Sequence, residues 1–158
     1  MEAFSIAEAA GEADIAACRE LFREYQRSLG IDLAYQDFEH ELATLPGKYA
    51  PPRGRLLLAR RGEEPLGCAA FRPLGAGDCE MKRLYVRPAA RGTGLGRALA
   101  VRLVAIARTQ GYARMRLDTL PAMGAAQGLY ERLGFRDTPA YYDSPVAGTR
   151  FMALDLSA

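Results

Sequence analysis

Three glycines at alternate positions, Gly92, Gly94 and Gly96, lie directly before a stretch of helical periodicity in the segment RPAARGTGLGRALA. Apolar residues three or four apart predict one face of a helix that ends at Gly111: Leu95, Leu99, Leu103 and Ile106. Glycine inside ordered structure costs about 0.5–1 kcal/mol relative to alanine. We therefore expect a ligand to come close to the backbone at this strand-to-helix turn.

Four interpretations of the glycine loop compete. A dinucleotide fingerprint, Gly-x-Gly-x-x-Gly, would need its last glycine at Arg97 or Leu99, and a nucleotide-hydrolase loop would need Gly-Lys-Ser/Thr. A tight turn alone accounts for one or two glycines, but hardly for three between two arginines. A pyrophosphate site accounts for all of them, because helix N-termini present unpaired N–H groups and Arg91 and Arg97 add charge-assisted hydrogen bonds.

The periodicity of the other segments predicts a mixed α/β protein with one domain over residues 1–158. Strands are expected at 4–9, 55–61, 66–74, 79–88, 112–120 and 150–156. Further helices are expected from Asp14 to Gly30, within 32–45, and over 123–134. This order favours antiparallel strands followed by a strand–helix–strand–helix–strand unit.

The strand expected at 79–88 shows a slip in apolar parity. Met81 stands at an odd position, whereas Leu84 and Val86 stand at even positions. A strand with a period of two residues needs one extra residue to keep all three on the same face. The sequence therefore predicts a β-bulge near Lys82–Arg83.

Composition limits the partners and the location. A net charge of +2 gives no electrostatic reason to expect nucleic acid, and no apolar run approaches the ~18 residues of a membrane span. Three scattered cysteines and the acidic start of the chain favour a reduced, cytoplasmic protein without a secretory signal. Because His40 is the sole histidine, neither a histidine-based metal site nor a Ser-His-Asp triad is expected.

Three segments resemble one family. RGTGLG resembles the Arg/Gln-x-x-Gly-x-Gly/Ala acetyl-CoA loop of the GCN5-related N-acetyltransferases (GNAT), with Arg91, Gly94 and Gly96 at the motif positions. CEMKRLYVRP resembles the bulged fourth strand of that family, and LYERLGF resembles the segment that carries its catalytic tyrosine. The resemblance implies a central, mostly antiparallel, splayed mixed sheet flanked by helices.

The resemblance also implies where acetyl-CoA binds. The pantetheine arm is expected between splayed strands at 79–86 and 113–120, with the pyrophosphate on the glycine loop. The cofactor-binding residues are expected to be Leu84, Tyr85, Val86, Arg91, Gly92, Thr93, Gly94, Leu95, Gly96 and Arg97. Many family members carry an asparagine seven residues before the tyrosine, where this chain has Met123.

The implied activity is transfer of an acetyl group to the amine of a small molecule by direct attack through a tetrahedral intermediate. Tyr130 matches the family's general acid, although a tyrosine on this helix could also be a core residue. Glu80 is the candidate base, against the alternative of an exposed strand residue paired with Lys82.

The acceptor is not named by the sequence. An acidic segment, 31–45, and the tyrosine-containing segment 140–148 are the expected walls of its site. A solvated helix face would explain the carboxylates of the first segment equally well. The alternatives are a protein or peptide amine as acceptor, or a CoA-binding regulatory module without catalysis. Because members of the family are often dimers, the resemblance also implies a homodimer.

Overall fold

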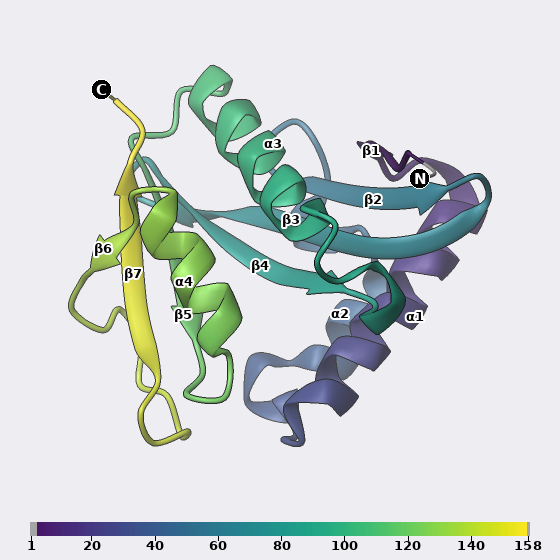
Figure 1. The fold of residues 1–158 in the computed structure, drawn as a ribbon. Coiled ribbons are helices and arrows are strands. Elements are labelled where there is room, and N and C mark those ends of the chain that lie inside the picture. Colours follow the sequence, from purple (N-terminus) through teal and green to yellow (C-terminus); the bar gives the residue numbers. More distant parts are fainter. Residues whose placement is uncertain (1–2, 158) are drawn as a thin grey trace.

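The computed structural model describes residues 3–157, which form a seven-stranded sheet with helices on both faces (Figure 1). The strands, in the order β1-β2-β3-β4-β5-β7-β6, are β1 Ser5–Glu8, β2 Arg55–Arg61, β3 Glu64–Gly75, β4 Asp78–Val86, β5 Arg114–Thr119, β6 Arg136–Asp137 and β7 Arg150–Asp155. The helices are α1 Gly11–Leu29, α2 Phe38–Thr44, α3 Leu95–Thr109 and α4 Gly124–Arg132, with 3-10 helices η1 Leu33–Gln36, η2 Gly47–Tyr49 and η3 Pro88–Ala90. The predicted mixed α/β fold is confirmed.

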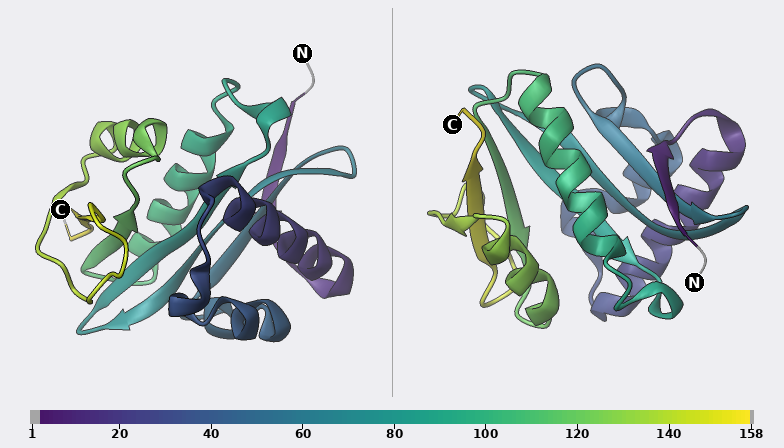
Figure 2. Two further views of the ribbon diagram at one scale, coloured as in Figure 1. Left: turned by 90° about the horizontal axis from the view of Figure 1, so that it is seen from below. Right: turned by 45° about the horizontal axis from the view of Figure 1, so that its top comes forward.

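The two faces of the sheet carry separate hydrophobic cores. Leu57 and Ala59 of β2 pack in the cluster that contains α3 and α4, whereas Leu56 and Leu58 pack in the cluster of α1 and α2. This alternation follows from the period of two in a strand, which sends successive side chains to opposite faces. Figure 2 shows the resulting layers, with the sheet between the two sets of helices.

The sheet is splayed between β4 and β5. These two strands pair in parallel over only three residue pairs, with Asp78–Glu80 of β4 opposite Arg114–Arg116 of β5. All the other neighbouring strands pair antiparallel. Beyond those three pairs β4 stays with β3, and β5 stays with β7 as far as Thr119. The predicted mostly antiparallel, splayed sheet is therefore confirmed.

The predicted bulge in β4 is confirmed. Cys68 of β3 pairs with Tyr85 and Ala70 pairs with Lys82, so β4 has one residue more than β3 over this interval. Arg83 within it has φ of 62°, in the left-handed region that residues other than glycine rarely adopt. The bulge lies on β4 just beyond its pairing with β5, so it coincides with the opening of the sheet.

A buried ion pair holds the bulge residue. The Arg83 guanidinium donates to both carboxylate oxygens of Glu41 in α2, at 2.8 and 3.0 Å, and to Gln36 Oε1 at 2.8 Å. Lys48 lies 3.2 Å from the same carboxylate. Burial raises the pKa of Glu41, but hydrogen bonds and charge from Arg83 outweigh burial and leave this pKa lowered. The pair therefore fixes α2 and η1 against β4.

Three details differ from the sequence predictions. The helix expected within 32–45 is divided into η1 and α2 because Asp37 adopts φ of 57°. The two-residue strand β6 was not predicted, since so short a strand has no periodicity. The first strand is shorter than expected, Ser5–Glu8.

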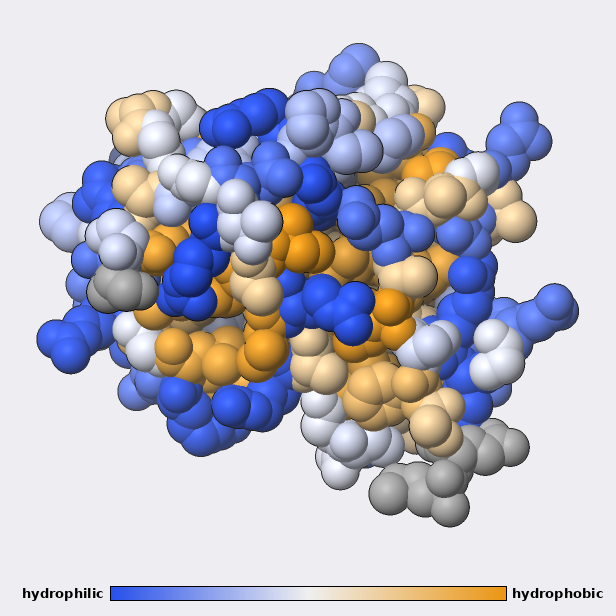
Figure 3. Space-filling view, turned by 90° about the horizontal axis from the view of Figure 1, so that it is seen from above, coloured by the Kyte–Doolittle hydropathy of each residue, from blue (hydrophilic) through white to orange (hydrophobic). Residues whose placement is uncertain are grey.

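The three cysteines of the chain form no disulfide bond in the described structure, residues 3–157. Cys18, Cys68 and Cys79 are free and buried, and burial raises the pKa of Cys18 and of Cys79 to about 12. No helix within residues 3–157 is both long and apolar enough to cross a membrane. In the view from above, hydrophobic residues lie among hydrophilic ones (Figure 3), and over the described residues Val101 is the exposed large hydrophobic residue, at 43%. The homodimer stays a prediction.

Replacement of Glu41 by glutamine is expected to lower the free energy of unfolding by about 3–5 kcal/mol, because it leaves the Arg83 charge buried without its carboxylate. Urea unfolding of the two proteins measures this difference. The control is Glu39→Gln, an exposed carboxylate on the same helix, which is expected to change stability by less than about 0.5 kcal/mol. Equal effects of the two changes would contradict a structural role for the pair.

Candidate functional site

A groove of about 560 Å³ lies where β4 and β5 separate, between the start of α3 and the start of α4. Nine of the ten residues expected to bind the cofactor line this groove: Leu84, Tyr85, Val86, Arg91, Gly92, Gly94, Leu95, Gly96 and Arg97. Thr93 is absent from the lining, and its hydroxyl donates to the Ala90 carbonyl at 2.6 Å. The splay of the sheet and the glycine loop thus form parts of one groove.

The three glycines of the loop differ in what they require. Gly92 has φ of 80° and Gly94 has φ of 84°, so both need glycine for the backbone conformation alone. Gly96 does not adopt such an angle, and a Cβ there would lie 3.7 Å from Val86 Cγ2, an ordinary contact. Of the three, Gly96 is therefore the position where a side chain would project from the helix start without backbone strain.

The N-terminus of α3 suits an anion. Gly94 is the N-cap of this 15-residue helix, and N–H groups in the first turn of a helix lack intrahelical acceptors. The helix dipole adds partial positive charge at the same end. The side chains of Arg91 and Arg97 are exposed beside it, with Arg91 Nε donating to the Val86 carbonyl at 3.1 Å. This end of the groove can hold phosphate groups.

A second, smaller pocket adjoins the groove. Tyr25, Leu29 and Met123 line both spaces, so the two are neighbours. The pocket contains about 20 Å³ of free volume, room for about one water molecule or a similar polar group. Its polar lining comes from several elements and includes Tyr35, Gln36, Lys82, Arg83, Asp118 and Tyr130.

Tyr130 lies where the pocket and the groove meet. It belongs to α4, next to the groove residue Leu129, and it is 4% exposed with its ring 5.7 Å from that of Phe135. Burial raises the pKa of Tyr130 well above the usual 10, and the nearby Tyr25 and Asp118 add to the rise. The phenol therefore stays protonated at neutral pH and can donate a hydrogen bond to a group in the groove or the pocket.

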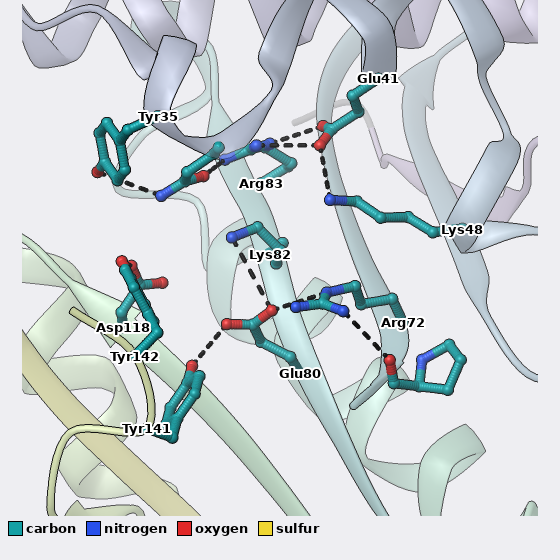
Figure 4. Close-up of polar contacts among 12 residues, drawn as sticks. Tyr35, Glu41, Lys48, Arg72, Glu80, Lys82, Arg83, Asp118, Tyr141 and Tyr142 are labelled. Atoms are coloured by element: carbon teal, nitrogen blue, oxygen red, sulfur yellow. Dashed lines mark hydrogen bonds and ion pairs between the residues drawn. The ribbon is translucent and has the colours of Figure 1, made fainter. Parts of the chain in front are cut away.

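Glu80 is buried, so the alternative of an exposed strand residue is wrong. Its carboxylate accepts a hydrogen bond from Arg72 Nε at 2.9 Å and another from the Tyr141 hydroxyl at 2.6 Å (Figure 4). Lys82 Nζ lies 3.9 Å from it. Both carboxylate oxygens thus have donors, and Glu80 does not line the pocket that contains Tyr130.

Asp118 is a candidate that the sequence analysis missed. It lies near the end of β5, lines the same pocket as Tyr130, and accepts a hydrogen bond from the Tyr142 hydroxyl. Figure 4 shows its carboxylate beside Tyr142 and across from Lys82. The strand pattern contained the signal, because Asp118 is the one carboxylate in the stretch YARMRLDTL that continues beyond the pairing with β4.

The two segments that were expected to line the acceptor site make different contacts. Tyr141 and Tyr142 of the segment 140–148 reach Glu80 and Asp118. The acidic segment contributes Tyr35 and Gln36 to the pocket but no carboxylate, since Glu41 is paired with Arg83 and its other acidic residues are exposed. Over residues 3–157 no group of three or more His, Cys, Asp or Glu residues could hold a metal ion.

Comparison with known proteins places these observations in a family. The model of the acetyltransferase (GNAT) family matches residues 15–135. An uncharacterised N-acetyltransferase of Schizosaccharomyces pombe is 41% identical, over 91% of this chain and 90% of that protein. An acetyltransferase from Streptococcus agalactiae shares the fold, with a TM-score of 0.80 and 22% identity, and the match covers 98% of this chain and 99% of that chain. A putative acetyltransferase from Salmonella typhimurium, solved with its cofactor acetyl-CoA, matches with a TM-score of 0.67 and 26% identity. The match covers 98% of this chain and 94% of that chain.

Proposed function

This chain belongs to the acetyltransferase (GNAT) family, and we propose that it transfers an acetyl group from acetyl-CoA to the amine of a small molecule. The observation that carries the proposal is the junction at Tyr130. A groove with an anion-binding end leads to a small polar pocket, and a buried, protonated phenol lies between them. A group-transfer enzyme needs this arrangement, because donor and acceptor must meet beside a proton donor.

Acetyl-CoA supplies the acetyl thioester. The residues of the groove fit it: the first turn of α3 and the exposed Arg91 and Arg97 would hold the phosphates. The edge of β4 at Leu84 and Val86 would pair with the amides of the pantetheine arm. Met123 stands where many relatives have asparagine, so at this position the chain offers a thioether in place of an amide.

Tyr130 is the proposed acid. As the tetrahedral intermediate collapses, the Tyr130 hydroxyl hydrogen-bonds to the departing sulfur and stabilises the thiolate. The raised pKa of Tyr130 keeps that hydroxyl protonated at neutral pH. The thiol is the stronger acid, with a pKa of about 8.5, so a phenol that gives its proton to the thiolate takes one back from solvent or from the protonated base.

The proposed base is a carboxylate at the acceptor end, and two compete for the role. The sequence favours Glu80. The geometry supports Asp118 better, because Asp118 lines the pocket beside Tyr130, whereas Glu80 lies outside its lining with both oxygens hydrogen-bonded. We therefore propose that Asp118 accepts the proton of the amine, and we keep Glu80 as the rival.

The proposed acceptor is a small molecule, and the pocket limits the part of it that enters to one small polar group such as an amine. About 20 Å³ admits one small polar group, and Tyr141, Tyr142 and η1 border the acceptor end. Thiol release from acetyl-CoA, measured against amines, amino acids, polyamines and peptides, tests the proposal. Release with a small amine together with its acetylated product is expected. Release only with peptides or proteins would overturn it.

Replacement of Gly96 by leucine is expected to weaken acetyl-CoA binding at least tenfold, because the side chain projects at the start of α3 into the groove. The variant should fold, since glycine is a poor helix former and φ at this position is not left-handed. Calorimetry measures the affinity, and Gly96→Ala serves as the graded control with a much smaller effect. Wild-type affinity in the leucine variant would show that the cofactor binds elsewhere.

Tyr130→Phe keeps the ring packed against Phe135 and removes the hydroxyl. The expected result is a fall in kcat of about 10²–10⁴-fold with KM for acetyl-CoA little changed. Tyr112→Phe is the matched control, because that buried hydroxyl donates to the Arg53 carbonyl away from the groove. Comparable kcat values for the two variants would return Tyr130 to a packing role.

The pH dependence of kcat/KM distinguishes the two candidate bases. Asp118→Asn is expected to lower the rate at pH 7, and the remaining rate should climb up to tenfold per pH unit below the pKa of the amine, as free amine accumulates. Glu80→Gln should give a profile parallel to that of the wild type between pH 6 and 9.5. A climbing profile for Glu80→Gln and a parallel one for Asp118→Asn would assign the role to Glu80.

A further inference from the structure

Lys82 and Asp118 face each other across the opening of the sheet. The last parallel pair between β4 and β5 is Glu80 with Arg116. Two residues further along each strand, on the same face, stand Lys82 and Asp118. Both line the small pocket beside Tyr130, and no ion pair joins them within 4 Å in the part of the chain that is described.

Among the described residues, Lys82 is a buried cation that forms a long ion pair with Glu80 but no hydrogen bond. Its side chain is 7% exposed, and the carboxylate nearest to its Nζ, that of Glu80, is 3.9 Å away. That carboxylate already accepts from Arg72 and Tyr141. Within residues 3–157 no acceptor lies within hydrogen-bond distance of Nζ, and in Figure 4 this atom points away from the Arg83–Glu41 pair.

A cation in such a position is costly unless an anion joins it, since an ammonium removed from water loses its solvation. Burial accordingly lowers the pKa of Lys82, while the charges of Glu80 and Asp118 oppose that shift and those of Arg83 and Lys48 support it. The neighbouring arginines are already paired, Arg72 with Glu80, Arg83 with Glu41 and Arg116 with Asp78. Of the two cations in the described lining of the pocket, Arg83 is hydrogen-bonded to Glu41, whereas Lys82 has only the 3.9 Å ion pair with Glu80. Lys82 therefore keeps its hydrogen-bond donors for a ligand.

Asp118 supplies the opposite charge on the other wall. Within the described part of the chain its carboxylate has one donor, the Tyr142 hydroxyl, and a carboxylate can accept several hydrogen bonds. A ligand placed between the strands would therefore meet a cation on β4 and an anion on β5. A zwitterion with one ammonium and one carboxylate complements both.

We propose that the acceptor is a free amino acid or a close amino-carboxylate, with its carboxylate on Lys82 and its amine at Asp118 beside Tyr130. This inference rests on the proposed function and names the substrate class of the same site. It separates small amino acids from peptide N-termini, whose first residue carries no free carboxylate.

The test compares amino acids with their primary amides and with the amines that lack the carboxyl group. Thiol release and the acetylated product are both measured. The wild type is expected to show kcat/KM about tenfold to a hundredfold higher for the best amino acid than for its amide, the range of a hydrogen bond to a charged group. In Lys82→Met this ratio should fall to near one, mainly through KM for the amino acid.

Two further variants test whether the preference depends on the positive charge at position 82. Lys82→Arg retains the charge and should retain part of the preference. Lys48→Met removes the other lysine of the chain, which is paired with Glu41 outside the pocket, and should keep the wild-type ratio. Calorimetry with acetyl-CoA is expected to give wild-type affinity for Lys82→Met, since Lys82 does not line the groove.

The outcomes separate the two proposals. Acetylation of amides and simple amines at rates equal to those of amino acids would overturn the amino-carboxylate and leave the proposed function standing. A preference for amino acids that survives in Lys82→Met would also overturn it, because the carboxylate would then be bound elsewhere. Failure to acetylate any small amine would overturn the proposed function itself.

Discussion

The end of the parallel pairing between β4 and β5 is the constraint on which the site depends. After Glu80 and Arg116 the strands diverge, so a groove opens inside a sheet that would otherwise be continuous. The bulge at Arg83 occurs on β4 at the same level, and the buried pair with Glu41 holds it in a backbone conformation that arginine rarely adopts. An ion pair between α2 and the strand beside the groove thus maintains the shape of the groove.

Burial at the junction shifts the pKa values of two groups in opposite directions. It raises the pKa of Tyr130 and lowers the pKa of Lys82. Both shifts favour the neutral form of the group, and an anionic ligand at Lys82 would favour the charged form of that residue. Ligand binding and the protonation state of the pocket are in this way linked through the same desolvation.

The sequence predicted the parts of the site that depend on local pattern. The parity of Met81 and Leu84 revealed the bulge, and the glycines marked the start of α3. The ion pair of Arg83 with Glu41 and the contact of Tyr142 with Asp118 join residues 42 and 24 positions apart, and no local pattern specifies such a choice of partner. The burial of Glu80 depends likewise on Tyr141, 61 residues away. Gly92 and Gly94 are also required by their backbone angles, a reason that the sequence pattern alone does not show.

The splayed sheet has a mechanical consequence. It consists of a four-stranded part, β1 to β4, and a three-stranded part, β5 to β7, joined over only three residue pairs. Beyond that joint the facing edges of β4 and β5 are not paired with each other. Side chains therefore carry the rest of the connection between the two parts: the hydrophobic core under α3 and α4 contains residues of β2, β4, β5 and β7, and Asp78 pairs with Arg114 and Arg116 across the joint.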